Sequence, residues 1–125
     1  MLKIIETTNA PQAIGPYSQA VQVAETLYIS GQTPLNPKTK KVVEEDIKIQ
    51  TRQCLENIKA IAEQAGFKTE NIVKCSVYLK DMSTFKNMNE VYASFFGSHK
   101  PARVTVEVSR LPLDALVEID AICAK

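Results

Sequence analysis

The spacing of apolar residues switches between two repeats along this chain of 125 residues, and the switches restrict the folds that it can adopt. An alternation of apolar and polar residues, which is typical of half-buried strands, occurs at residues 19–24, 27–30, 72–79, 101–109 and 115–122. A repeat of three to four residues, typical of amphipathic helices, follows Asp46 and again follows Ser83. We therefore expect the order strand, strand, helix, strand, helix, strand, strand, with an additional candidate strand at residues 2–5.

The ends of both helices carry residues that favour helix termini. Gly66 and Gly97 stand where a C-terminal cap is expected, and Ser83 is predicted to be the N-cap of the second helix. The first helix would bury Cys54, Leu55, Ile58, Ile61, Ala62 and Ala65, and the second would bury Phe85, Met88, Val91, Tyr92 and Phe95. Each helix therefore has one apolar face that must pack against another element.

Two helices can cover only one face of a sheet with five or six strands, so the predicted fold class is α+β. Helical connections between strands make some neighbouring strands parallel, which predicts a mixed sheet. The short connection at residues 110–114 predicts, in addition, that the last two strands form an antiparallel hairpin. The fold expected from the pattern is thus a mixed sheet with two helices on one face.

Polar residues of the last two strands are predicted to gather on the uncovered face of this sheet. The strand at 101–109 is expected to turn three valines toward the core: Val104, Val106 and Val108. Arg103 and Thr105 then lie on the other side, and Glu118 joins them because it alternates with apolar residues in its own strand. Arg103 and Glu118 are therefore predicted to face the same way. Tyr28 and Ser30 are expected there too, and this mixed character favours contact with another subunit.

Composition indicates one domain without a general affinity for anionic polymers. A chain of 125 residues with 45% hydrophobic content can bury one core, so we expect a single domain at residues 1–125. Fifteen basic against fourteen acidic residues leave a net charge of +1, so neither nucleic acid nor membrane is an expected partner. No signal peptide or membrane span is expected. Cys54, Cys75 and Cys123 lie in apolar stretches, which is typical of reduced cysteines in a cytoplasmic protein.

Arg103 and Glu118 are the residues that most suggest chemistry. Arg103 begins a strand after Pro101, where its planar fork of donors could hold a small carboxylate. The alternative is an ordinary salt bridge to Glu118 or Glu107 across the hairpin. Glu118 could act as a general acid or base if its surroundings bring its pKa toward the working pH, and is otherwise a solvated strand carboxylate. The strand pattern alone leaves both alternatives open.

Several other residues could line a cleft. Tyr17 follows the Gly15–Pro16 turn, where its phenol could stand at a cleft edge or pack over apolar neighbours. Ser30 and Gly31 could offer a hydroxyl and a backbone N–H to an anion, although a glycine at a strand end also marks a bulge or a turn. Asn89 stands between core positions of the second helix and points either to a groove or to solvent.

Metal and nucleotide sites are not indicated by the sequence. His99 is the single histidine and has no cysteine or carboxylate at ligand spacing, so neither a metal site nor a Ser-His-Asp or Cys-His arrangement is expected. The four glycines form neither GxGxxG nor GxxxxGK, so no standard nucleotide loop is present.

Separated segments along nearly the whole chain resemble one protein family in the same order. They are Ala13-Ile14-Gly15-Pro16-Tyr17-Ser18-Gln19-Ala20, Ile29-Ser30-Gly31-Gln32 with Asn36-Pro37, the helix from Gln53 to Gly66, Val77-Tyr78-Leu79-Lys80-Asp81, and Pro101-Ala102-Arg103 through Val117-Glu118-Ile119. The chain resembles the RidA/YjgF family, the reactive intermediate deaminases. This resemblance implies a chorismate-mutase-like fold with a six-stranded sheet, assembled as a homotrimer whose sheets form a central barrel with clefts between subunits.

The resemblance also implies an activity. Family members hydrolyse 2-imino and 2-enamino acids, such as 2-aminoacrylate and 2-iminobutyrate, to 2-keto acids and ammonia without a cofactor, as 2-iminobutanoate/2-iminopropanoate deaminases. By this resemblance Arg103 would bind the substrate carboxylate, Glu118 would position the attacking water, and Tyr17 would belong to the same catalytic set. The residues that would bind substrate beside them are Ser30, Gly31, Asn89 and Thr105.

Three positions depart from the family pattern. Thr105 stands where some relatives have cysteine, so covalent catalysis by a thiol is excluded there, and Asp120 stands where glutamate is common. The connection at 97–100 is shorter than in some members, which bears on the cleft rim and on substrate size. Two other functions stay open: a non-catalytic module that binds small 2-keto acids, and an RNA-cleaving or translation-inhibiting activity, which the near-zero net charge disfavours.

Overall fold

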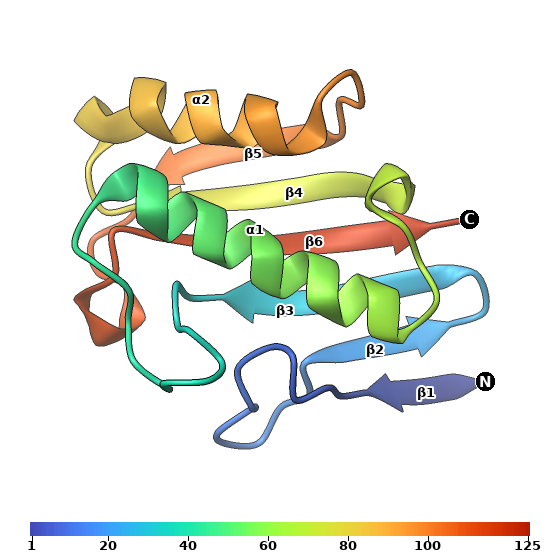
Figure 1. Cartoon of the computed structure of the whole chain (residues 1–125). Helices are drawn as coiled ribbons and strands as arrows, with labels where there is room; N and C mark the ends of the chain where they lie inside the picture. The colour runs from blue at the N-terminus through green and yellow to red at the C-terminus, as the bar shows by residue number, and fades with distance from the viewer.

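A computed structural model describes all 125 residues, with two helices lying on one face of a six-stranded sheet (Figure 1). The strands are β1 Leu2–Ile5, β2 Ala20–Val23, β3 Thr26–Gln32, β4 Ile72–Leu79, β5 Ala102–Glu107 and β6 Val117–Ala124. The helices are α1 Ile47–Gln64 and α2 Phe85–Phe96, with 3₁₀ turns at Thr69–Asn71, Met82–Thr84 and Pro112–Asp114. The predicted α+β class and mixed sheet are confirmed, because β4 and β5 are parallel while the other pairs are antiparallel.

The last two strands are not neighbours, so the predicted hairpin through residues 110–114 is wrong. The strand order is β1-β2-β3-β6-β4-β5, in which β6 pairs with β3 and β4, and β5 pairs only with β4. The central place suits β6 because the apolar residues on its core-facing side are each at most 2% exposed, namely Val117, Ile119, Ala121 and Cys123. The connection after β5 therefore passes β4 before the chain re-enters the sheet.

The two faces of β5 are reversed relative to the prediction. Val104 and Val106 are 43% and 40% exposed on the uncovered face, whereas Arg103 and Thr105 face the helices. Thr105 aligns with Val77, which is fully buried, and residues that align across neighbouring strands share a face. Alternation shows which residues of a strand share a face, but it does not show which face the helices cover.

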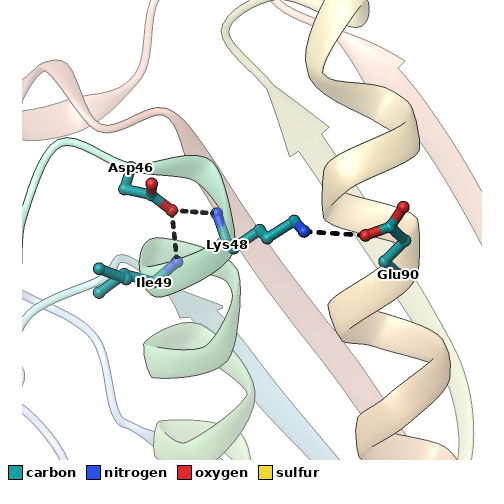
Figure 2. A network of polar contacts seen from close by, with 4 residues as sticks. All are labelled: Asp46, Lys48, Ile49 and Glu90. Atoms are coloured by element: carbon teal, nitrogen blue, oxygen red, sulfur yellow. Dashed lines mark hydrogen bonds and ion pairs between the residues drawn. The ribbon is translucent and has the colours of Figure 1, made fainter.

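α1 begins at Asp46, whose backbone is extended with a φ of −143°. Its Oδ1 accepts hydrogen bonds from the N–H groups of Lys48 and Ile49 at 2.9 and 3.1 Å (Figure 2). These bonds satisfy two of the N–H groups that a helix start leaves free. The helix ends before Gly66, whose φ of +83° favours glycine, as predicted. The predicted stripe is largely buried, through Cys54, Leu55, Ile58, Ile61 and Ala62.

α2 is preceded by a 3₁₀ turn, so its start differs from the prediction. Thr84 and not Ser83 is the N-cap, and Asp81 Oδ1 accepts a hydrogen bond from the Ser83 N–H at 2.8 Å. The buried residues of the helix follow a spacing of four, at Met88, Tyr92 and Phe96. Because this row faces the sheet, Val91 beside it is only partly buried. Gly97 ends the helix, as predicted.

A register shift accounts for one further difference in β4. Its pairing with β6 shifts between Ile72 and Lys74. The shift turns Ile72 inward and leaves Val73, which simple alternation predicts on the same face as Cys75, 43% exposed. The remaining alternation of this strand agrees with the prediction.

One cluster of 23 buried residues forms the core between the helices and the sheet, and it contains all three free cysteines. Burial raises the pKa of Cys75 to about 11 and that of Cys123 to about 12, so both thiols stay protonated. On the outer surface, Lys48 Nζ and Glu90 Oε2 lie 2.9 Å apart and link α1 to α2 (Figure 2). No helix combines the length and the apolar character that crossing a bilayer requires.

Candidate functional site

Arg103 occupies a half-buried position where β5 meets α2. Its Nη1 donates a hydrogen bond to Asn89 Oδ1 at 2.7 Å, and its guanidinium carbon lies 4.7 Å from the centre of the Tyr92 ring and 5.5 Å from that of Phe85. Both aromatic rings attract the cation, while Asn89 offers a neutral acceptor. The guanidinium is therefore oriented by its neighbours but keeps its full charge.

No carboxylate of the chain neutralises this guanidinium. Both ion pairs of the chain involve lysines, and Arg103 belongs to neither of them. Glu107 accepts a hydrogen bond from the Met82 N–H at 2.8 Å, and Glu118 lies on the other face of the sheet. The salt-bridge interpretation of Arg103 is therefore wrong. Since Asn89 uses one of its five N–H donors, the others can bind both oxygens of a carboxylate.

A pocket of about 410 Å³ opens beside Arg103 and has no acidic residue in its walls. His99 and Lys100 line it together with the arginine. His99 Nε2 lies 2.6 Å from the Ile72 carbonyl oxygen, which can only accept, so this nitrogen is the donor. Basic and neutral walls around a free guanidinium favour an anionic ligand.

Two buried hydroxyls near Arg103 have no oxygen or nitrogen partner in the chain, namely Tyr92 Oη, which adjoins the Cys75 thiol, and Thr105 Oγ1. Thr105 lies two residues along β5 from Arg103 on the same face, and the Tyr92 ring stacks on the guanidinium. Burial raises the pKa of Tyr92, so its phenol keeps its proton. Because buried polar groups are nearly always bonded, an unpartnered hydroxyl such as that of Thr105 is unusual beside the arginine.

Glu118 lies on the uncovered face of the sheet, in β6. Tyr78 aligns directly with it from β4, and Gly31 adjoins it from β3. A methyl group on Gly31 would overlap the Glu118 carboxylate, so only glycine leaves room for it. Gly31 belongs to a bulge, since the pairing of β3 with β6 shifts between Ile29 and Gln32.

The Glu118 carboxyl is half buried and has no hydrogen-bond partner in the chain. Burial raises its pKa from the ordinary value, and the negative charge of Asp120 raises it further. Asp120, in contrast, accepts a hydrogen bond from the Tyr78 hydroxyl at 3.1 Å. A pocket of about 300 Å³ lies over Glu118 and also meets Arg110 from the loop after β5. Glu118 is thus an acid whose charged form is poorly stabilised and which faces an open pocket.

Tyr17 stands on a loop that is bonded to the bulge in β3. Ser30 Oγ donates a hydrogen bond to the Ser18 carbonyl oxygen at 2.6 Å, and the Ser30 N–H donates to the Gln19 carbonyl oxygen at 2.9 Å. Gln19 is 3% exposed, and its side-chain amide binds the backbone of residues 7–11. Tyr17 itself is 54% exposed, so its phenol is accessible and does not close over a core.

The candidate residues therefore form two half-sites on opposite faces of the sheet. The Arg103 half-site consists of Arg103, Asn89, Tyr92 and Thr105. The Glu118 half-site consists of Glu118, Asp120, Tyr78 and Gly31, and the loop of Tyr17 is bonded to the same bulge through Ser30. Arg103 aligns with buried Cys75, whereas Glu118 and exposed Val106 both align with Tyr78. The prediction that Arg103 and Glu118 face the same way is wrong, because the sheet separates them within one chain.

Sequence reasoning missed three residues of these half-sites and their surroundings. The helical spacing predicts only a core position for Tyr92, and the sequence indicates no role for Tyr78 or for Arg110, which lies in a predicted turn. The missing information was the strand order, because Tyr78 meets Glu118 only when β4 and β6 are neighbours. No group of three or more His, Cys, Asp or Glu side chains is arranged to hold a metal ion.

The fold and the two half-sites define a small α+β protein with an arginine free to bind an anion and a separate half-buried acid. Residues 7–125 match the family model described as Endoribonuclease L-PSP, which represents the YjgF/RidA family. The chain belongs to this family, so the resemblance carried by its sequence segments is confirmed.

Its similarity to individual proteins extends over the full length. A RutC family protein of Pyrococcus horikoshii is 59% identical over 125 residues, which cover 100% of this chain and 99% of that protein. The 2-iminobutanoate/2-iminopropanoate deaminase of Salmonella typhimurium is 49% identical over 128 residues, covering 100% of this chain and 99% of that protein. A crystal structure of a Rid family protein of unknown function from Yersinia pestis has a TM-score of 0.97, 48% identity and 100% coverage of both chains.

Proposed function

We propose that this protein hydrolyses reactive 2-imino and 2-enamino acids, such as 2-aminoacrylate and 2-iminobutyrate, to 2-keto acids and ammonia. The observation that carries the proposal is the state of Arg103, which is oriented by Asn89 and Tyr92 and lacks any carboxylate partner. A free guanidinium suits the carboxylate that all these substrates share. The name of the Salmonella typhimurium relative supports the same reaction class.

We infer further that each working site joins the Arg103 half-site of one copy to the Glu118 half-site of another. Arg103 and Glu118 of one chain lie on opposite faces of the sheet, while a small imino acid holds its carboxylate and its reactive carbon on adjacent atoms. Tyr28, Val104 and Val106 are at least 40% exposed on the uncovered face and provide apolar surface for contact between copies. A homotrimer with clefts between neighbouring subunits satisfies this requirement by cyclic symmetry.

In the proposed reaction, Arg103 anchors the carboxylate and Glu118 moves protons. Protonated Glu118 donates its proton to the imine nitrogen, or to the terminal carbon of an enamine, and thereby makes C2 electrophilic. The resulting carboxylate takes a proton from the water that adds to C2, which gives a carbinolamine. Glu118 then returns this proton to the nitrogen, the C–N bond breaks with release of ammonia, and the hydroxyl proton goes back to Glu118 as the keto group forms.

The remaining residues would position the reactants. Gly31 adjoins Glu118, Ser30 bonds the loop of Tyr17 to the same bulge, and Asn89 and Thr105 lie beside the arginine. Holding the imine and the water together converts a chance encounter into a local reaction. None of these steps uses a metal or an organic cofactor, and Thr105 offers a hydroxyl for hydrogen bonding where a thiol could have reacted.

A mixture of two inactive variants tests both the reaction and the shared site. A threonine dehydratase generates the imine in place, and formation of the keto acid is followed with and without the protein. Arg103→Ala and Glu118→Gln are each expected to lose nearly all acceleration. When equal amounts of the two are refolded together into a trimer, roughly a quarter of the clefts contain an intact Arg103 and an intact Glu118, and activity of that order returns.

Two outcomes would contradict these proposals. If mixed oligomers form but stay inactive, the two residues do not come from different copies. If the unaltered protein does not accelerate keto acid formation, the reaction itself is not its function. A binding module without turnover would in that case be recognised by calorimetry, since 2-oxobutanoate would still bind and Arg103→Ala would abolish that binding.

A further inference from the structure

Two carboxyl groups on β6 point to the uncovered face of the sheet but have unequal partners. Asp120 Oδ2 accepts the hydrogen bond of the Tyr78 hydroxyl at 3.1 Å, whereas no donor of the chain reaches the Glu118 carboxyl. Tyr78 aligns directly with Glu118 across the strands, yet its single proton is directed to Asp120. The Glu118 carboxylate lies over Gly31, where a side chain would otherwise stand. Glycine has no side chain that could donate a hydrogen bond to it.

We propose that Asp120 and Tyr78 are positioning residues that keep a proton on Glu118 at the start of the reaction. A donated hydrogen bond stabilises the charged form of a carboxyl group, and of these two carboxyl groups only that of Asp120 receives one. When two carboxyl groups lie close together, a shared proton goes to the one whose charged form is less stabilised. That group is Glu118. This inference rests on the proposed function, in which Glu118 first acts as a proton donor.

The directions of the pKa shifts agree with this geometry. Burial is the main cause that raises the pKa of Glu118, and the charge of Asp120 is the second. Burial is also the main cause that raises the pKa of Tyr78, so its hydroxyl keeps the proton that it donates to Asp120. Two acids with different surroundings can thus take different roles on one strand.

The cations near these acids do not reverse the assignment. Lys74 lines the neighbouring pocket of about 280 Å³ together with Asp120, and Glu118 is not part of that pocket. The lysine therefore shares a pocket with Asp120 and not with Glu118. Arg110 shares the pocket over both acids but forms an ion pair with neither. In the shared cleft, the substrate carboxylate neutralises the Arg103 that the other copy contributes.

The other elements packed against Glu118 add no competing charge. From β3, Gly31 adjoins Glu118 and does not titrate, and the Tyr28 phenol lies farther along the same strand. On the core side of the sheet the titratable neighbour is Cys54, whose pKa burial raises well above its ordinary value. Lys80, which follows β4, is held 2.8 Å from Asp114.

The pH dependence of the reaction tests the proposal, because a purely structural role of Asp120 would not move it. The rate is expected to fall as the pH rises through the point at which Glu118 loses its proton. In Asp120→Asn the negative charge is gone, Glu118 ionises more easily, and the fall moves to lower pH by about one unit. Tyr78→Phe is expected to move the fall of the rate in the same direction but by less, because Asp120 then loses the hydrogen bond that Tyr78 donates to it.

Matched variants separate this effect from general damage. Asp120→Glu keeps the charge and is expected to restore the unaltered pH profile. Glu63→Gln removes one negative charge from the exposed side of α1 and is expected to leave the profile in place. If Asp120→Asn lowers the rate by one factor at every pH, or moves the fall to higher pH, the proposal is overturned.

A titration that needs no catalysis decides the same question. The ¹³C signal of the Glu118 carboxyl, assigned by its disappearance in Glu118→Gln, is followed against pH in the unaltered protein and in Asp120→Asn. A lower midpoint in Asp120→Asn supports the proposal, and an equal or higher midpoint overturns it. If the unaltered protein proves inactive, the proposed function fails while these midpoints still locate the proton.

Discussion

Arg103 is held in place by what surrounds it, whereas Glu118 occupies a space that its surroundings leave open. The arginine donates one hydrogen bond to Asn89 and lies over the rings of Tyr92 and Phe85. The glutamate has no hydrogen-bond partner in the chain and extends over Gly31, the residue without a side chain. The charge of Arg103 is oriented by its contacts. The charged form of Glu118 is partly buried and has no hydrogen bond that would replace lost hydration.

The difference follows from what each group is proposed to do. A group that binds an anion benefits from a fixed direction and a permanent charge, which neutral partners provide. A group that must give and take a proton benefits from a charged form that is only weakly stabilised, since its pKa then moves toward the working pH. The two half-sites can therefore be tested separately, by ligand affinity for one and by reaction rate for the other.

The largest expected effect is on binding at the Arg103 half-site. Arg103→Ala is expected to weaken the binding of 2-oxobutanoate about 100-fold or more, because the ligand carboxylate loses its charged partner. Glu118→Gln, with the same half-site intact, is expected to bind the keto acid nearly as the unaltered protein does. Calorimetric titration of both variants measures this contrast. Equal losses of affinity in the two variants would show that binding does not depend mainly on the Arg103 half-site.

The next effect is on rate at the Glu118 half-site. Gly31→Ala is expected to slow the reaction roughly 10- to 100-fold, because the added methyl group displaces the carboxylate from its working position. Binding of 2-oxobutanoate, measured in the same preparation, is expected to change much less than the rate.

A second substitution checks that steric overlap is the cause. Aspartate is shorter than glutamate by one methylene group, so Glu118→Asp relieves the overlap with residue 31. The rate lost through Gly31→Ala is therefore expected to be smaller in the Glu118→Asp background, which a double-mutant cycle measures. An equal loss in both backgrounds would assign the effect of Gly31→Ala to the bulge itself.

The smallest effect concerns the neutrality of the residue that holds Arg103. Asn89→Asp keeps an acceptor for the 2.7 Å hydrogen bond but adds a charge that competes with the ligand for the guanidinium. We expect binding of 2-oxobutanoate to weaken about tenfold, a loss comparable to that of a charge-assisted hydrogen bond. Asn89→Ala, which leaves Arg103 unneutralised, is expected to bind the keto acid more tightly than Asn89→Asp. The reverse order would contradict the assignment.

The sequence predicted the elements of this fold better than their neighbours in the sheet. The spacing of four in the helices and of two in the strands reflects which residues share a face, so α1, with its cap at Gly66, and the inward side of β6 were found. Strand order depends on how the connections pass over the sheet, which residue spacing does not encode. The place of β6 between β3 and β4 was missed for this reason.

The error in strand order carried over to the candidate site. Val104, Val106 and Arg103 alternate in the same way whichever face of β5 is covered, and the predicted hairpin assigned the valines to the core. In the structure, α2 provides Asn89 and an aromatic surface that accommodate an arginine at the sheet edge. The sequence therefore suggested Arg103 and Glu118 as candidates, but it did not predict that the sheet separates them.

The bonds from Ser30 to the loop of Tyr17 have a further consequence for how a substrate is selected. Because these bonds join the loop to β3 and to residues 7–11, we expect it to keep its place when a larger molecule meets the proposed cleft. A loop that is ordered before binding loses little conformational entropy when a ligand binds. The few polar groups of a very small molecule can then be enough for binding. The same rigidity sets a size limit, and we expect bulky side chains on the imine to be rejected by shape before any chemistry begins.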